Sequence, residues 1–171
     1  MSSSERRHFL LLAGTSATLL AGCGFQLRQP PRLPFRSIAL TGFAPRSPLA
    51  EELKRALATQ LRVMDVPADE RNSADVVLHA LADARERSVV AQTSSAQVRD
   101  VQLRVKLHFR AHTPAGRELL APSILLLARD MSFNETASLA KAQEEGELYR
   151  EMQSDVVAQV VRRLASIKLT P

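Results

Sequence analysis

The feature that most constrains the fold is a strict alternation of apolar and polar side chains over residues 100–110, DVQLRVKLHFR. Its apolar members are Val101, Leu103, Val105, Leu107 and Phe109. Because successive side chains of a β-strand point to opposite faces, this pattern predicts a half-buried strand with one apolar and one strongly basic face. An apolar strand face must be buried against another layer of secondary structure.

Two segments have the periodicity of amphipathic helices that can form this layer. The Ser-Pro pair at 47–48 is a good N-cap and first-turn pair, and leucines at every fourth position from 49 to 61 predict a helix of about 15 residues. A longer helix is predicted to begin at Asn134 or Ser138 and to end at about Ser166. The apolar face of the longer helix comprises Leu148, Met152, Val156, Val160, Leu164 and Ile167.

Three further strands complete the predicted fold. Residues 35–42 form a short strand, and residues 74–92 begin as a strand whose later, alanine-containing half is ambiguous. A hairpin turn at 113–116 leads from the alternating strand to a strand at 118–133, where Pro122 favours an edge position or a bulge. The predicted class is α+β: a two-layer α/β sandwich with a four-stranded mixed sheet covered on one face by two helices. The first strand-helix-strand unit should be a parallel crossover, and the later strands antiparallel hairpins.

The N-terminal residues 1–22 have the composition of an export signal. Two arginines at 6–7 precede an apolar stretch at 9–20, which is too short to span a bilayer as a helix, since spanning takes roughly 20 apolar residues. The proline-containing segment 23–34 is predicted to be an extended tether, and residues 35–171 to be one domain.

Cys23 is the only cysteine of the chain, so it cannot form an internal disulfide. The preceding residues give LAGC at 20–23, which resembles the bacterial lipobox. This resemblance implies that Cys23 becomes the acylated N-terminus after cleavage, and Gly24 in place of Asp implies sorting to the outer membrane. The alternative is a free thiol buried in a core. The arginine pair also resembles the twin-arginine export motif, which leaves the route of export open.

The sequence argues against catalysis, metal binding and nucleic-acid binding. It contains none of the common catalytic or phosphate-binding motifs, and no cofactor is expected beyond the covalent lipid on Cys23. His108 and His112 share a strand face but lie about 13 Å apart along it, so surface positions are favoured over a shared metal. The chain has no Trp and one Tyr, which disfavours a base-stacking platform.

The formal net charge of +5 fits either an acidic partner or an ordinary solvated surface. The alternation places Arg104, Lys106 and Arg110 on one face of the strand at 100–110. If helices cover the other face, these cations are available to phosphates or acidic sugars.

The order of these features resembles the LptE family of lipopolysaccharide-assembly lipoproteins. The resemblance rests on CGFQLR at 23–28 after the lipobox, SPLAEELKRAL at 47–57, the long hairpins and the helix at 139–167. It implies the sandwich fold, a position inside the β-barrel of LptD, a role in assembling that barrel, and lipopolysaccharide binding. The alternative is a stand-alone periplasmic lipid-binding or chaperone lipoprotein without a barrel partner.

The resemblance also implies two cationic positions. SLAK at 138–141 is similar to an Ala-Leu-Ala-Lys run at the start of the family's last helix, which makes Lys141 a candidate lipopolysaccharide contact. A second family cation lies near the tip of a hairpin, where this chain has Ser94, and Arg99 is the candidate substitute.

Overall fold

The computed structural model describes residues 31–64 and 74–168. The predicted signal peptide, Cys23 and most of the tether lie outside these residues. The described elements, in chain order, are β1 (Ser37–Thr41), α2 (Pro48–Ala58), β2 (Arg62–Met64), β3 (Val76–Gln92), β4 (Val98–His112), β5 (Glu118–Ser132), the 3₁₀ turn η2 (Glu135–Ala137) and α3 (Ser138–Ala165).

The strands form one mixed sheet in the order β2-β1-β3-β4-β5. β1 pairs in parallel with β2 and β3, whereas β3, β4 and β5 pair antiparallel, as predicted. The predicted count of four strands is corrected to five, because the chain after α2 returns beside β1 as the three-residue β2. A strand of that length has too few residues to show an alternating pattern. β5 is an edge strand, which accommodates Pro122 as predicted.

A bulge in β3 explains why its later half is ambiguous in sequence. Ala80 pairs with Phe109 and Ala82 with His108, so Leu81 is the extra residue. Before the bulge, Leu78 and Ala80 belong to the buried core. After it, the odd-numbered residues of β3 lie opposite the buried residues of β4. The insertion therefore changes which residues of the strand face the helices.

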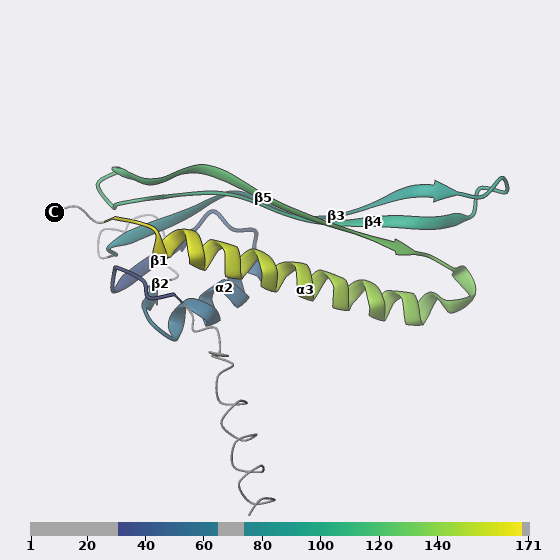
Figure 1. The fold of residues 1–171 in the computed structure, drawn as a ribbon, viewed down its shortest axis with the longest axis horizontal. Coiled ribbons are helices and arrows are strands. Elements are labelled where there is room, and N and C mark those ends of the chain that lie inside the picture. Colours follow the sequence, from purple (N-terminus) through teal and green to yellow (C-terminus); the bar gives the residue numbers. More distant parts are fainter. Residues whose placement is uncertain (1–30, 65–73, 169–171) are drawn as a thin grey trace, which may run out of the picture. The chain divides into compact units, whose positions relative to one another are not determined.

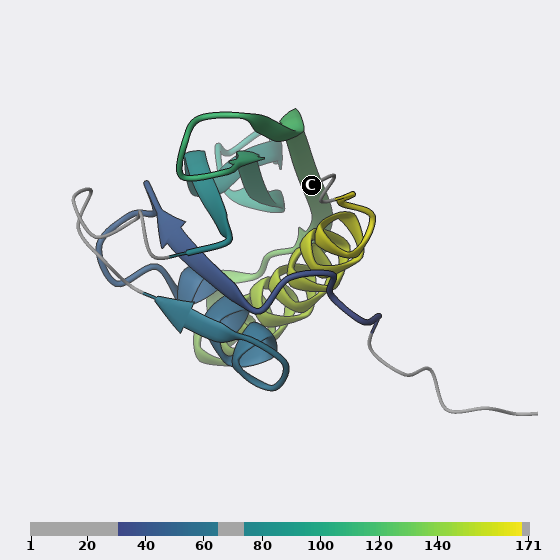
Figure 2. The ribbon, with the colours of Figure 1, turned by 90° about the vertical axis from the view of Figure 1, so that its left-hand side faces the viewer.

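Both helices lie on the same side of the β3–β4–β5 strands (Figures 1 and 2). In α2, Pro48 occupies the first turn and Ser47 Oγ accepts a hydrogen bond from the Ala50 amide at 3.1 Å. The helix ends at Ala58 after 11 residues, shorter than predicted, although Leu61 beyond it is still buried. The spacing of the leucines therefore continues one turn past the helix itself.

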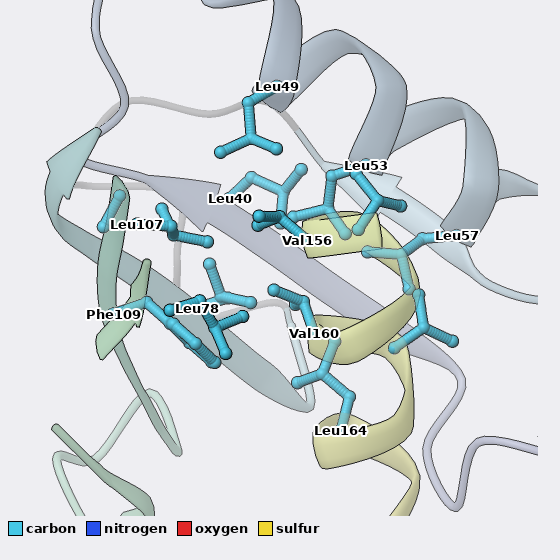
Figure 3. Close-up of a cluster of buried hydrophobic side chains, with 14 of the residues drawn as sticks. Leu40, Leu49, Leu53, Leu57, Leu78, Leu107, Phe109, Val156, Val160 and Leu164 are labelled. Carbon is cyan, nitrogen blue, oxygen red and sulfur yellow. The ribbon is translucent and has the colours of Figure 1, made fainter. Parts of the chain in front are cut away.

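The 28-residue α3 begins at Ser138, while Asn134 caps the short η2 turn before it. Its predicted apolar face is buried from Met152 to Ile167, and Leu148 is half-buried. These side chains pack against leucines of α2 and the inner faces of β1, β3 and β4 to form one core (Figure 3). All five apolar residues of the alternating strand are 0 or 1% exposed, which confirms that their face is covered by the helices.

The two long hairpins close with turns of the same form. The Thr113 amide donates to the carbonyl of Arg117, and the Thr113 hydroxyl accepts a hydrogen bond from the Arg117 amide. Thr93 makes the same two hydrogen bonds with Gln97. Gly116 and Ala96 occupy the positive-φ position, at φ 91° and 61°. Glycine adopts this conformation without the Cβ clash that alanine meets there, so the predicted turn at 113–116 has the better-suited residue.

Asp75 ties the start of β1 to the start of β3. One of its carboxylate oxygens accepts hydrogen bonds from the amides of Arg36 at 2.9 Å and Ser37 at 3.0 Å, and its own amide donates to Ser37 Oγ. The hydrogen bond from the Arg36 amide is the largest cause that lowers the pKa of Asp75 below its usual value. The charged carboxylate therefore favours the folded state.

Asp75→Asn is expected to lower stability at pH 7 by on the order of 1 kcal/mol, a small value because the site is exposed to solvent. Since the folded pKa is the lower one, this contribution is complete above the unfolded pKa of about 4 and is lost as the pH falls through the folded value. Urea unfolding of both proteins at pH 7 and near pH 3 measures it. A difference in stability that stays constant between these pH values would contradict the role of the charge.

Candidate ligand-binding surface

The face of the β3–β4–β5 strands that points away from the helices is called the open face here. On β4 it carries the polar members of the alternating pattern, because their apolar neighbours turn toward α3. Arg104, Lys106 and Arg110 therefore share this face at alternate positions, with His108 between the last two. Lys106 and Arg110 are four strand residues apart, or about 13 Å.

Arg104 is the cation of this row that the chain itself partly compensates. Its Nε donates to Gln102 Oε1 at 2.7 Å, and the amide nitrogen of Gln102 donates to Asp130 on β5 at 2.9 Å. In the register of β3 and β4, Glu86 lies directly opposite Arg104. Part of the Arg104 charge is thus balanced by acidic neighbours on both adjoining strands.

Lys106 and Arg110 lack such compensation. The cross-strand neighbours of Lys106 are Ala84 on β3 and Leu126 on β5, and Arg110 lies opposite His79. Within residues 31–64 and 74–168, neither cation makes a hydrogen bond or an ion pair. Their charges are therefore free to meet an anionic group from outside the chain.

Large apolar side chains flank these two cations. Leu126 is 57% exposed and lies beside Lys106, while Ile124 is 55% exposed and lies beside His108. Leu81, pushed outward at the bulge of β3, is 42% exposed. The open face thus combines uncompensated positive charge with apolar surface, a combination that suits an anionic amphiphile.

The other two predicted cations lie near the end of β5 rather than in the middle of the open face. Seven strand residues, or about 23 Å, separate Arg99 from Lys106. Arg99 is exposed and helps line an open recess of about 350 Å³ together with Phe133 and the η2 turn. The structure therefore divides the candidate cations into two groups, one on the open face and one near the end of β5.

Lys141 already has partners within the chain. Its ammonium group lies 2.8 Å from a carboxylate oxygen of Glu144 and donates to Ser132 Oγ at 3.3 Å. Only 19% of its side chain is exposed. These contacts attach the first turn of α3 to the end of β5, so a ligand phosphate would have to compete with Glu144 for this cation.

The sequence reading missed two arginines that hold the first half of α3 against the sheet. The Arg87 guanidinium pairs with Glu145 at 3.2 Å and lies 5.3 Å from the centre of the Phe133 ring. Arg85 lies at the same distance from the Tyr149 ring and donates to Gln153. No local pattern marks these two arginines, because the bulge that places them on the helix side is defined by the pairing of β3 with β4.

Tyr149 and Gln153 complete this polar layer. The Tyr149 hydroxyl donates to the carbonyl of Glu86 at 2.8 Å, and burial is the main cause that raises the pKa of Tyr149. Gln153 is only 4% exposed and donates to the carbonyl of Pro48, so it links α3 to α2. Polar contacts thus join α3 to the sheet where the apolar core ends.

The sheet and the two helices on its one side form a domain of the two-layer α+β class. A sequence model of LptE, described as lipopolysaccharide-assembly, matches residues 35–164, which is well over half of the chain. The chain belongs to the LptE lipopolysaccharide-assembly family. In the described part of the chain, no helix is both long and apolar enough to cross a membrane.

Individual proteins agree with this assignment. An LPS-assembly lipoprotein LptE from Pectobacterium atrosepticum is 29% identical over 167 residues, covering 95% of this chain and 88% of the relative. The solution structure of an uncharacterized lipoprotein B from Nitrosomonas europaea is 28% identical with a TM-score of 0.67, covering 84% of this chain and 91% of that one. A minor lipoprotein from Acinetobacter baumannii shares the fold, with a TM-score of 0.61 at 23% identity, over 81% of this chain and 99% of that one.

Proposed function

We propose that this chain is a lipid-anchored outer-membrane lipoprotein that sits as a plug in the LptD β-barrel, helps that barrel assemble and binds lipopolysaccharide. In this proposal residues 1–22 are a signal peptide, Cys23 carries the covalent lipid and residues 35–171 form the working domain. The protein has no catalytic role. Family membership supports the role in lipopolysaccharide assembly, and the resemblance of the sequence to LptE motivates the barrel partner.

One observation carries the lipopolysaccharide-binding part of the proposal. Lys106 and Arg110 project from the open face without a partner in the described chain, beside the exposed apolar side chains of Ile124 and Leu126. Lipopolysaccharide presents phosphates next to acyl chains, so one molecule can satisfy both features. Arg104 extends the row, and Arg99 and Lys141 are a second candidate group near the end of β5.

Co-purification tests the barrel partnership. The full chain, expressed together with LptD and extracted in detergent, should elute as a stoichiometric complex. A chain that folds and reaches the membrane but elutes without the barrel protein would favour a stand-alone lipid-binding or chaperone lipoprotein.

Reversing the free cations with Lys106→Glu and Arg110→Glu together should weaken lipopolysaccharide binding by about tenfold or more, because two attractive contacts become repulsive. Binding of the purified full chain to lipopolysaccharide at low and high salt measures this effect. Wild-type affinity should fall at high salt, since exposed charges are screened. Dephosphorylated lipopolysaccharide should bind the wild-type chain more weakly and should be less sensitive to the reversal.

A matched control reverses charges on the opposite layer. Glu147→Lys with Arg150→Glu exchanges an exposed ion pair of α3 and should leave binding unchanged. Lys141→Glu, tested alone, separates the two candidate groups. Undiminished binding by the open-face variant, together with a loss in Lys141→Glu, would move the site to the end of β5.

A further inference from the structure

β5 leaves its outer edge unpaired. In the described part of the chain its backbone ladder pairs with β4 alone, and it is 15 residues long, whereas the strand at the other edge, β2, has three residues. A long unpaired edge is a template for another strand, and proteins usually protect such edges with charges, prolines or bulges.

The hydrogen-bond phase of β5 shows which backbone groups point outward. The register pairs Asp100 with Ser132, so that Arg99 lies opposite Phe133. Because the Phe133 amide donates to the carbonyl of Arg99 at 2.6 Å, Arg99 and Phe133 form a hydrogen-bonded pair. Bonded and non-bonded pairs alternate along an antiparallel ladder, and the register is regular from Asp100 to Phe109. The amides of Leu125, Leu127 and Arg129 therefore point to β4. Those of Ile124, Leu126 and Ala128 point to the free edge.

The middle of this edge lacks protection. Residues 119–128 contain no charged side chain, and Pro122 and the adjoining register shift affect only one end of that stretch. At the other end, the Arg129 side chain donates to the carbonyl of Ala128 at 3.2 Å and so covers one edge acceptor. The segment between these two ends is Ser123–Ala128, SILLLA, which is called the edge window below; its one covered edge group is the Ala128 carbonyl.

We infer that the edge window is a docking site for an extended segment of another chain, which adds a sixth strand beside β5. This inference rests on the proposed function for the source of that segment, namely the barrel protein. The strands of a closed barrel are paired on both sides, so the added strand comes from a loop or terminal segment of the barrel protein. Apolar residues should alternate along it to meet Ile124 and Leu126.

The surrounding charges favour an acidic partner over a second copy of this chain. Lys106 lies directly beside Leu126 on the open face and has no acidic partner in the described chain. A second copy paired through its own edge window would place its Lys106 three strand spacings away, or about 14 Å, and would bring no acidic side chain of its edge window to the seam. An acidic side chain on the added strand would lie two strand spacings, or about 10 Å, from β4 and would supply the counter-charge for Lys106 that a second copy lacks.

Residue-resolved hydrogen exchange on the full chain, alone and in complex with the barrel protein, tests the inference. In the free chain the amides of Leu125 and Leu127 should exchange slowly and those of Ile124, Leu126 and Ala128 rapidly. In the complex the second set should slow by more than about tenfold, because each amide gains a cross-strand partner. Contact through side chains alone would not produce this alternating gain.

Two substitutions at one position separate backbone pairing from side-chain contact. Leu126→Pro removes an outward amide without removing a bond to β4, whereas Leu126→Ala shortens the side chain and keeps the amide. Leu126→Pro should reduce the amount of co-purified barrel protein several-fold more than Leu126→Ala does. An equal loss in the two variants would overturn strand pairing, and the exchange experiment tests it even if the proline variant folds poorly.

The outcomes separate this inference from the proposed function. If the barrel protein co-purifies and the edge-window amides stay unprotected, the docking site is wrong and the partnership stands. If no barrel protein co-purifies, the proposed function fails and the inference fails with it. Protection that appears in the free chain and grows with its concentration would identify a second copy as the occupant and would also overturn the inference.

Discussion

Leu107→Asp is expected to unfold the domain. Leu107 is fully buried near the middle of β4 and belongs to the same core as the buried leucines and valines of α2 and α3 (Figure 3). Loss of a buried leucine alone costs about 2–5 kcal/mol, and an unpaired buried carboxylate adds several more. The sum approaches or exceeds the roughly 5–15 kcal/mol that holds a typical domain folded. Loss of the cooperative thermal transition, followed by circular dichroism, is the expected result.

Lys106→Asp is the matched control, since it introduces the same residue one position away on the open face. Its carboxylate stays in contact with water, so the free energy of unfolding should change by no more than about 1 kcal/mol. Leu103→Asp, two residues before Leu107 on the same face, should behave like Leu107→Asp. Similar losses of stability in Lys106→Asp and Leu107→Asp would contradict the register of β4.

The strand register was predictable because alternation is a direct consequence of backbone geometry. Each apolar residue of the pattern at 100–110 is buried, and each cation between them lies on the other face. The buried faces of α2 and α3 were predictable for the same reason, because residues four apart lie on one face of a helix. Local periodicity alone therefore predicts the two layers of the sandwich and the basic face of β4.

β2 and the second half of β3 could not be predicted in this way. β2 is defined by its pairing with β1 and not by its own three residues. In β3 the bulge at Leu81 interrupts the alternation, so the placement of Arg85 and Arg87 under α3 depends on pairing with β4. Both features arise from contacts between distant segments, which a local pattern does not record.

In the candidate site, too, local periodicity predicts some features, whereas others depend on the pairing of strands. Arg104, Lys106 and Arg110 were placed together by alternation alone, and the structure brings them to one face. The contacts that distinguish them are cross-strand: Gln102 and Asp130 compensate Arg104, whereas Lys106 faces Ala84 and Leu126. Which cations remain free is therefore a property of the whole sheet.

Cys23→Ala is expected to release the protein from the membrane into the soluble fraction while leaving the domain folded. The proposed acyl chains on Cys23 supply the affinity for the bilayer, at about 0.8 kcal/mol for each buried methylene group. Leu33 and Phe35 are the first residues that pack on the described core, so the cysteine is ten residues before the first of them in sequence. Fractionation of cells without added barrel protein measures the release, and thermal unfolding checks the fold.

A variant of a neighbouring residue makes this test specific to the thiol. Gln26→Ala lies three residues along the same segment, keeps Cys23 and should remain with the membrane. Mass spectrometry of the wild-type protein should find a mature N-terminus at Cys23 that carries acyl chains. If Cys23→Ala stays in the membrane fraction of cells that lack the barrel, the lipid is not the anchor. If it stays only when the barrel is present, contact with the barrel is sufficient to hold the folded domain at the membrane after the lipid is removed.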